Sequence, residues 1–63
     1  MERYGIFRRL ADGAPMWITA THDLESAKQS AIKNAALHRT ECFVFDLRDY
    51  KTVFEIGKTI KAV

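Results

Sequence analysis

Side chains that could perform chemistry are few and scattered in this sequence. His38 and Cys42 stand four residues apart, and His22 is the only other histidine. A zinc site would have to recruit a carboxylate, because structural zinc is almost always four-coordinate. A spacing of four brings two ligands together only within one helix, and a helix end is predicted between these two. We therefore interpret His38 as a residue near a helix C-terminus and Cys42 as a buried thiol, and we expect no metal site.

Catalytic signatures are equally sparse. A nucleophile would need a histidine within hydrogen-bond reach and a third group to orient that histidine, and no local signature of such a set occurs. Asp46 and Asp49 flank a predicted turn, where aspartate is favoured for bonds to nearby backbone. The Gly-Lys-Thr at 57–59 lacks the earlier glycine of a phosphate-binding loop and the helix that should follow. We expect no catalytic residues, no cofactor and no enzyme activity from this chain alone.

Arg8 and Arg9 are the strongest indication of a nucleic-acid partner. Together with Lys51 and nearby sheet aromatics they could hold phosphate while bases stack. Against this stand ten basic and eight acidic residues, a net charge of only +2. Nucleic-acid binding is therefore an alternative rather than the preferred hypothesis.

Length and composition limit what the chain can be. Sixty-three residues allow one domain with one small core. A single cysteine excludes an internal disulfide and favours a reduced, cytoplasmic setting. The longest uninterrupted apolar run, 42–45, is far too short to span a membrane, and the N-terminus does not read as a signal peptide.

The elements that must position these residues follow from alternation and propensity. Residues 3–10 and 16–21 alternate in the manner of strands, and Asp-Gly-Ala-Pro between them predicts a hairpin turn. Residues 23–38 contain no Gly or Pro and favour a helix with Asp23 as its N-cap. Residues 41–46 and 50–56 predict a second hairpin, and 57–63 a short tail that frays or extends the edge.

We therefore predict an α+β domain of order β-β-α-β-β, with a four-stranded antiparallel sheet and one helix on one face. The predicted strand order is 2-1-3-4, because the strand at 41–46 is apolar on both parities and should lie inside the sheet. One helical face carries Leu24, Ala27, Ala31, Ala35 and His38.

Alternation along the strands divides their side chains between two faces of the sheet. The set expected beneath the helix is Tyr4, Ile6, Leu10, Met16, Ile18, Ala20, Phe43, Phe45, Phe54 and Ile56. The set expected on the uncovered face is Phe7, Arg9, Trp17, Thr19, Cys42, Val44, Asp46, Lys51, Val53 and Glu55. The candidate interaction surface within the second set is Phe7, Arg9, Trp17, Thr19, Val44, Lys51 and Val53.

Several segments resemble a group of short, uncharacterised bacterial proteins. They are Tyr4-Gly5-Ile6-Phe7-Arg8-Arg9, Asp12-Gly13, Pro15-Met16-Trp17, Leu24-Glu25-Ser26-Ala27-Lys28 and Phe43-Val44-Phe45-Asp46-Leu47-Arg48. The resemblance implies a small bacterial cytoplasmic domain and no assigned activity. It also implies a glycine near Asp49 or Tyr50, which this sequence lacks.

The preferred functional hypothesis is a non-enzymatic interaction module, a homodimer or the partner of another protein, that uses the uncovered sheet face. A competing interpretation gives this face no binding role: its aromatics only pack against one another across the strands of a solvated sheet. Two further alternatives are a nucleic-acid binder and a subunit of a composite enzyme whose site is completed by another chain. We expect no membrane association.

Overall fold

The structure is a computed structural model, and it describes residues 2–57. The elements are β1 (Tyr4–Arg9), β2 (Pro15–Thr21), α1 (Leu24–His38), β3 (Cys42–Asp46) and β4 (Lys51–Ile56). These bounds agree with the predicted elements to within one residue at each strand end. Of the predicted tail, only Gly57 belongs to the described residues, and the prediction for the remainder falls outside them.

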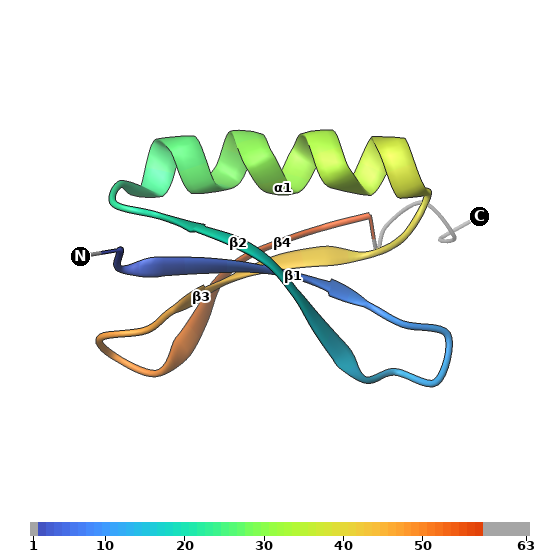
Figure 1. The fold of residues 1–63 in the computed structure, drawn as a ribbon, viewed down its shortest axis with the longest axis horizontal. Coiled ribbons are helices and arrows are strands. Elements are labelled where there is room, and N and C mark those ends of the chain that lie inside the picture. The colour runs from blue at the N-terminus through green and yellow to red at the C-terminus, as the bar shows by residue number, and fades with distance from the viewer. Residues whose placement is uncertain (1, 58–63) are drawn as a thin grey trace.

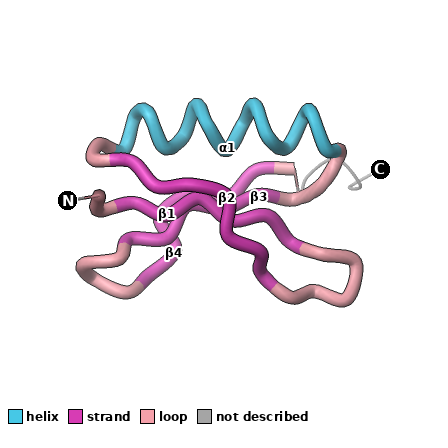
Figure 2. Tube along the Cα trace, viewed as in Figure 1, coloured by secondary structure: helices cyan, strands magenta, loops and turns pink. Residues whose placement is uncertain are grey.

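All four strands form one antiparallel sheet in the order β2-β1-β3-β4, which confirms the predicted fold class and strand order. Figure 1 shows α1 lying along one side of a strongly twisted sheet, with both hairpin turns curving away from the helix at opposite ends of the molecule. Figure 2 shows the same two layers, helix above and strands below. The described residues contain no helix long and apolar enough to cross a membrane.

Local chemistry fixes both ends of α1. The Asp23 carboxylate accepts a hydrogen bond from the Ser26 backbone N–H at 2.9 Å, and this bond lowers the pKa of Asp23. At the other end Arg39 adopts a left-handed conformation with φ of 53°, and the N–H groups of Arg39 and Thr40 both donate to the Ala35 carbonyl. The helix therefore begins and ends where capping predicts.

The buried stripe of α1 consists of alanines. Ala27, Ala31 and Ala35 are buried, and they pack against Ile6, Cys42 and Val44 of the two central strands. Such small side chains let the helix lie close to the sheet. His38, expected on the same stripe, is exposed, because it occupies the last position of the helix, beyond the buried alanines.

Register explains which strand residues lie under the helix, because paired residues in an antiparallel sheet point to the same side. Three rows cross the sheet on this side. They are Met16, Arg8, Cys42 and Ile56; then Thr19, Ile6, Val44 and Phe54; then Thr21, Tyr4, Asp46 and Lys51.

Two register shifts interrupt these rows. One lies opposite Ile6 and Phe7 and leaves Ile18 as an extra residue in β2; the other lies opposite Val44 and Phe45 and leaves Val53 as an extra residue in β4. Both extra residues pack against the core. A bulge changes the parity of everything beyond it, so simple alternation fails along both outer strands.

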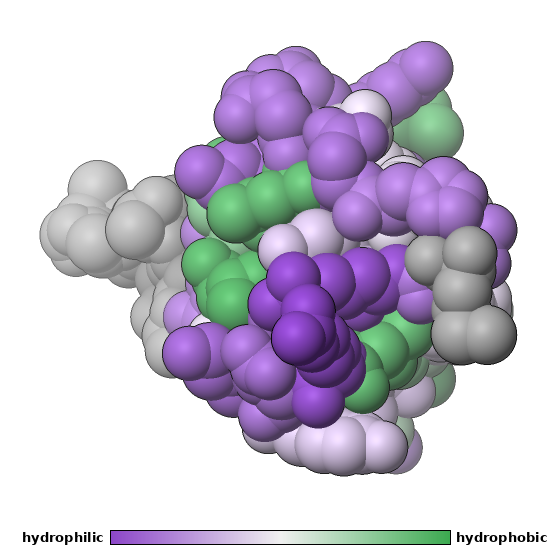
Figure 3. Space-filling view, turned by 90° about the vertical axis from the view of Figure 1, so that its left-hand side faces the viewer, coloured by the Kyte–Doolittle hydropathy of each residue, from purple (hydrophilic) through white to green (hydrophobic). Residues whose placement is uncertain are grey.

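The turn between β3 and β4 is stabilised by the contacts of one buried carboxylate. Asp46 is 2% exposed, pairs with the Arg3 guanidinium at 2.9 Å, and accepts hydrogen bonds from the N–H groups of Arg48 and Asp49. The Arg3 hydrogen bond, reinforced by the two N–H groups, holds the pKa of Asp46 well below its usual range. Figure 3 views this end of the molecule, where hydrophilic side chains lie among smaller apolar patches.

The same turn takes a left-handed conformation without glycine. Tyr50 has φ of 56°, and its N–H donates to the Asp46 carbonyl at 2.7 Å. The resemblance implied glycine near this position, and the backbone conformation explains why glycine would suit it. Tyr50 is 78% exposed, so its side chain contributes little to the turn.

Candidate functional site

The sheet face opposite α1 carries an aromatic cluster, defined here as Phe7, Trp17, Phe43 and Phe45. Two rows of paired residues cross this face: Trp17, Phe7, Phe43 and Glu55; then Ala20, Gly5, Phe45 and Thr52. Members of the cluster come from β1, β2 and β3, so it forms only when the two hairpins join. None of the described helical residues lies over it (Figure 1).

Phe7 is the centre of the cluster. Its ring stacks on Phe43 with centroids 5.2 Å apart and planes 10° from parallel. The rings of Trp17 and Phe45 lie close to perpendicular to the Phe7 ring, at centroid distances of 5.4 and 6.5 Å. These distances and angles fall in the favourable range for aromatic pairs, each contributing about 0.5–1.5 kcal/mol beyond buried area.

Gly5 provides the floor on which two of the rings lie. A Cβ atom at this position would stand 3.0 Å from a ring carbon of Phe7 and 3.0 Å from a ring carbon of Trp17. Contacts of this length are tighter than most that real Cβ atoms make, so a larger residue would require the rings to shift by a few tenths of an ångström. The absence of a side chain at Gly5 therefore allows both rings to approach β1 closely.

Burial varies strongly within the cluster. Phe43 is only 6% exposed although none of the described elements covers this face, whereas Trp17 is 53% exposed. Phe43 is enclosed by the stacked Phe7 ring and by the Arg9 guanidinium, which lies 4.5 Å from the Phe43 centroid. The cluster thus buries its own centre and leaves one large apolar side chain, Trp17, in solvent.

Three charged side chains of the described part of the chain border the cluster. Arg9 approaches the Glu41 carboxylate at 3.9 Å and donates to the Gly13 carbonyl at 3.3 Å. Glu55 occupies the end of the Phe43 row. One cation and two carboxylates give this face no excess of positive charge.

The structure brings together Phe7, Arg9 and Trp17 from the predicted interaction surface. The prediction is wrong for Val44 and Val53, which pack in the helix-side core. Thr19 and Lys51 also pair with residues of the helix side, namely Ile6 and Asp46.

Five other face assignments were reversed. Ala20, Phe43 and Phe45 lie on the open face, and Cys42 and Asp46 lie on the helix side. The strand 42–46 is apolar on both parities, so alternation alone could not orient it. Along β2 and β4 the cause is the two bulges.

Sequence reasoning therefore missed Gly5, Phe43 and Phe45 as members of the site. One signal could have found the two phenylalanines. An alanine-faced helix approaches its sheet closely, and the space beneath it suits Cys42 and Val44 better than two phenyl rings.

Groups with chemical potential lie elsewhere. Cys42 is fully buried, and burial raises the pKa of its thiol, which opposes reactivity. Among residues 2–57, no group of three or more His, Cys, Asp or Glu side chains is placed to hold a metal ion. Arg8 shares the helix side with Cys42, so the two consecutive arginines lie on opposite faces of β1.

No protein-family model, curated protein or solved structure matches this chain. The resemblance to short bacterial proteins therefore remains a prediction, and the function has to be argued from the aromatic cluster itself.

Proposed function

We propose that this chain is a non-enzymatic interaction module that self-associates through the aromatic cluster. The observation that carries the proposal is the half-exposed Trp17, seated beside three phenylalanines on a sheet face that no described element covers. Tryptophan is enriched among the residues that dominate binding energy at interfaces, especially where a rim of near-neutral contacts surrounds it.

Charge favours a second copy of the chain as the occupant. In a two-fold dimer each surface meets its own duplicate, so a patch of one sign would repel itself. β2 (Pro15–Thr21) contains no charged residue, whereas the other outer strand, β4, carries Lys51 and Glu55. A copy that lies over Trp17 and β2 therefore meets apolar and hydroxyl groups rather than like charges.

The same charges give little support to nucleic acid. Stacking of bases on a sheet requires cations beside the aromatics. Among residues 2–57, Arg9 is the only cation bordering the cluster and has Glu41 close by, while Arg8 faces the helix side. The composite-enzyme alternative also gains nothing, because the strongly perturbed carboxylate, Asp46, is committed to Arg3 and to a turn.

The small total surface of the chain suggests a weak dimer. A standard interface removes about 800 Å² from each partner, a large share of the 4458 Å² total surface of this chain. The contact must then extend well beyond Trp17, and we expect association between about 10 μM and 1 mM.

Multi-angle light scattering over that concentration range tests the proposal. We expect the mass to rise from that of the 7.2 kDa chain toward twice that value. Trp17→Ser should shift the midpoint to higher concentration by about tenfold or more. Tyr50→Ser removes another exposed aromatic, outside the cluster, and should leave the midpoint unchanged. A monomer at every concentration, or equal effects of both substitutions, would contradict the proposal.

A further inference from the structure

A cationic groove lies at the end of the molecule where α1 finishes. It has a volume of about 510 Å³ and separates the C-terminal end of β1 from the last turn of the helix. Its lining residues include Arg8, Arg9, His38, Arg39 and Glu41. The groove shares Arg9 and Glu41 with the border of the aromatic cluster, but Arg8 faces the helix side of the sheet.

Positive charge in this groove is not balanced by the described residues. Three arginines and one histidine line it against one carboxylate, Glu41, which lies 3.9 Å from Arg9. The side chains of Arg8 and Arg39 have no hydrogen-bond or ion-pair acceptor among residues 2–57. Two guanidinium groups therefore remain available to an anion.

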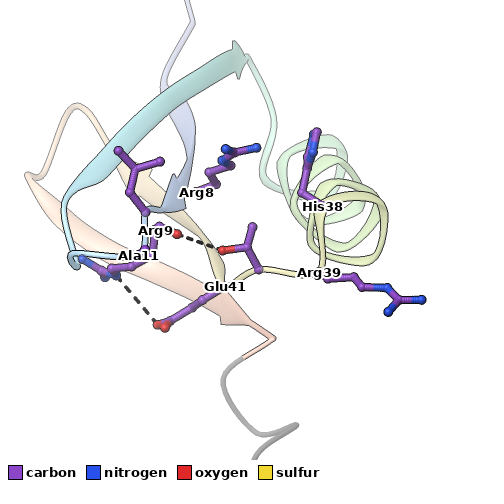
Figure 4. Close-up of a pocket in the computed structure, with 8 residues that line it drawn as sticks. Arg8, Arg9, Ala11, His38, Arg39 and Glu41 are labelled. Carbon is purple, nitrogen blue, oxygen red and sulfur yellow. Dashed lines mark hydrogen bonds and ion pairs between the residues drawn. The ribbon is translucent and has the colours of Figure 1, made fainter.

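Arg8 is the better placed of these two. It is half-buried and sits opposite the fully buried Cys42 in the register of β1 and β3. Figure 4 shows the Arg8 side chain reaching from β1 toward the helix, with the His38 ring across the gap and Arg39 directed outward. A guanidinium partly withdrawn from water gains more from a bound anion than an exposed one does.

We propose that this groove binds the phosphate group of a small phosphorylated molecule, with Arg8 as the principal ligand. The planar guanidinium can donate two parallel hydrogen bonds to one phosphate. Arg39 adds positive potential from the helix side. A net charge of +2 is too small to hold a long polyanion, whereas one phosphate needs only this local cluster.

A purely structural role for the same cations makes a different prediction. Positive side chains near the last turn stabilise a helix by balancing the negative end of its dipole. In that case Gln substitutions would lower the stability of the fold, and phosphate would have no specific effect.

A titration of the ¹⁵N-labelled full chain with inorganic phosphate distinguishes these roles. Chloride at matched ionic strength is the control, and the readout is the set of backbone amide and arginine Nε–H shifts. We expect saturable shifts at Arg8 and around 38–41, with a dissociation constant near 1 mM or below. Arg8→Gln should weaken binding about tenfold or more, since charge-assisted hydrogen bonds of this kind contribute about 1.5–3 kcal/mol. Arg48→Gln, an exposed arginine in the turn at the opposite end, should have no effect.

Arg8→Lys keeps the charge but loses the planar guanidinium that can donate two parallel hydrogen bonds. This variant should fold normally, and it should nevertheless bind phosphate more weakly than the native chain. Shifts no larger than those caused by chloride would refute the proposal. A single-stranded oligonucleotide that binds far more tightly than phosphate, and loses affinity equally with Arg8→Gln and Arg48→Gln, would also refute it in favour of a diffuse polyanion surface. The proposal is independent of self-association, and Trp17→Ser should leave phosphate binding intact.

Discussion

The two faces of this sheet exclude water from their apolar side chains in different ways. Beneath α1, alanines at 27, 31 and 35 meet Ile6, Cys42 and Val44, and these small and medium side chains are excluded from water by a second layer. On the opposite face large rings exclude water from one another within a single layer, and Phe43 reaches 6% exposure with no element of residues 2–57 covering it.

This difference assigns separate roles to neighbouring aromatics. Phe7 and Phe43 contribute to the fold, because each is enclosed by other rings or by Arg9. Trp17 lies at the margin of the cluster and on an outer strand, so half of its surface remains in water. The open face is therefore partly a second core and partly a contact surface, and the boundary between the two runs between Phe7 and Trp17.

The largest effect is expected for Phe43→Ala. If the open face is a second core, this substitution should lower the free energy of unfolding by about 3–5 kcal/mol, comparable with the 2–5 kcal/mol expected for Ile6→Ala under the helix. Urea denaturation of both variants makes the comparison. If Phe43→Ala lowered the free energy of unfolding by less than about 1 kcal/mol, the aromatics of the open face would contribute little to the stability of the fold.

Gly5→Ala should have a smaller effect. Its Cβ would stand 3.0 Å from both Phe7 and Trp17, so we expect a loss of about 1–3 kcal/mol from overpacking. The loss should be smaller in a Trp17→Ser background, where one of the two clashes is absent, and a double-mutant cycle by urea denaturation measures this coupling. Strict additivity would contradict the placement of the Trp17 ring over Gly5.

Trp17→Ser alone should change stability still less. Its edge contact with Phe7 accounts for about 0.5–1.5 kcal/mol, and half of the ring is already hydrated. Thermal unfolding at a concentration below the association range isolates the contribution of this contact to the stability of the monomer. A loss as large as that of Phe43→Ala would place Trp17 in the core and remove it from the contact surface.

The acid sensitivity of the fold should depend on Asp46. The pKa of Asp46 is held down in the folded state by Arg3 and two backbone N–H groups, so its contribution to stability is present above about pH 4, the unfolded pKa, and is lost as the pH falls below it. Asp23 acts in the same direction through Ser26. Denaturation curves at pH 7 and below pH 4 should show a smaller pH-dependent loss in Asp46→Asn than in the native chain. An unchanged loss would show that Asp46 does not govern acid sensitivity.

Sequence reasoning predicted the fold because local signals agreed with one another. Asp23 marks the helix start, Asp12-Gly13 marks the first hairpin, and the doubly apolar strand at 42–46 marks the sheet interior. Each of these signals acts within a few residues, so it survives without knowledge of tertiary contacts.

The composition of the site was only partly predictable. The residues Phe7, Arg9 and Trp17 were found, but Val44 and Val53 were placed on the wrong face. Bulges at Ile18 and Val53 are set by how strands pair, and a period-two pattern carries no mark of them. The orientation of the central strand depends on the volume available beneath an alanine helix, which is a property of packing rather than of alternation.

The most direct test of the aromatic cluster as a self-association surface is an isotope-filtered NOE experiment on a mixture of ¹³C-labelled and unlabelled chains. At a concentration above the association midpoint, we predict intermolecular NOEs from the Trp17 ring to residues of β2 and to Phe45. Intermolecular NOEs confined to the outer surface of α1, where Leu37 is 70% exposed, or none at all, would contradict the account.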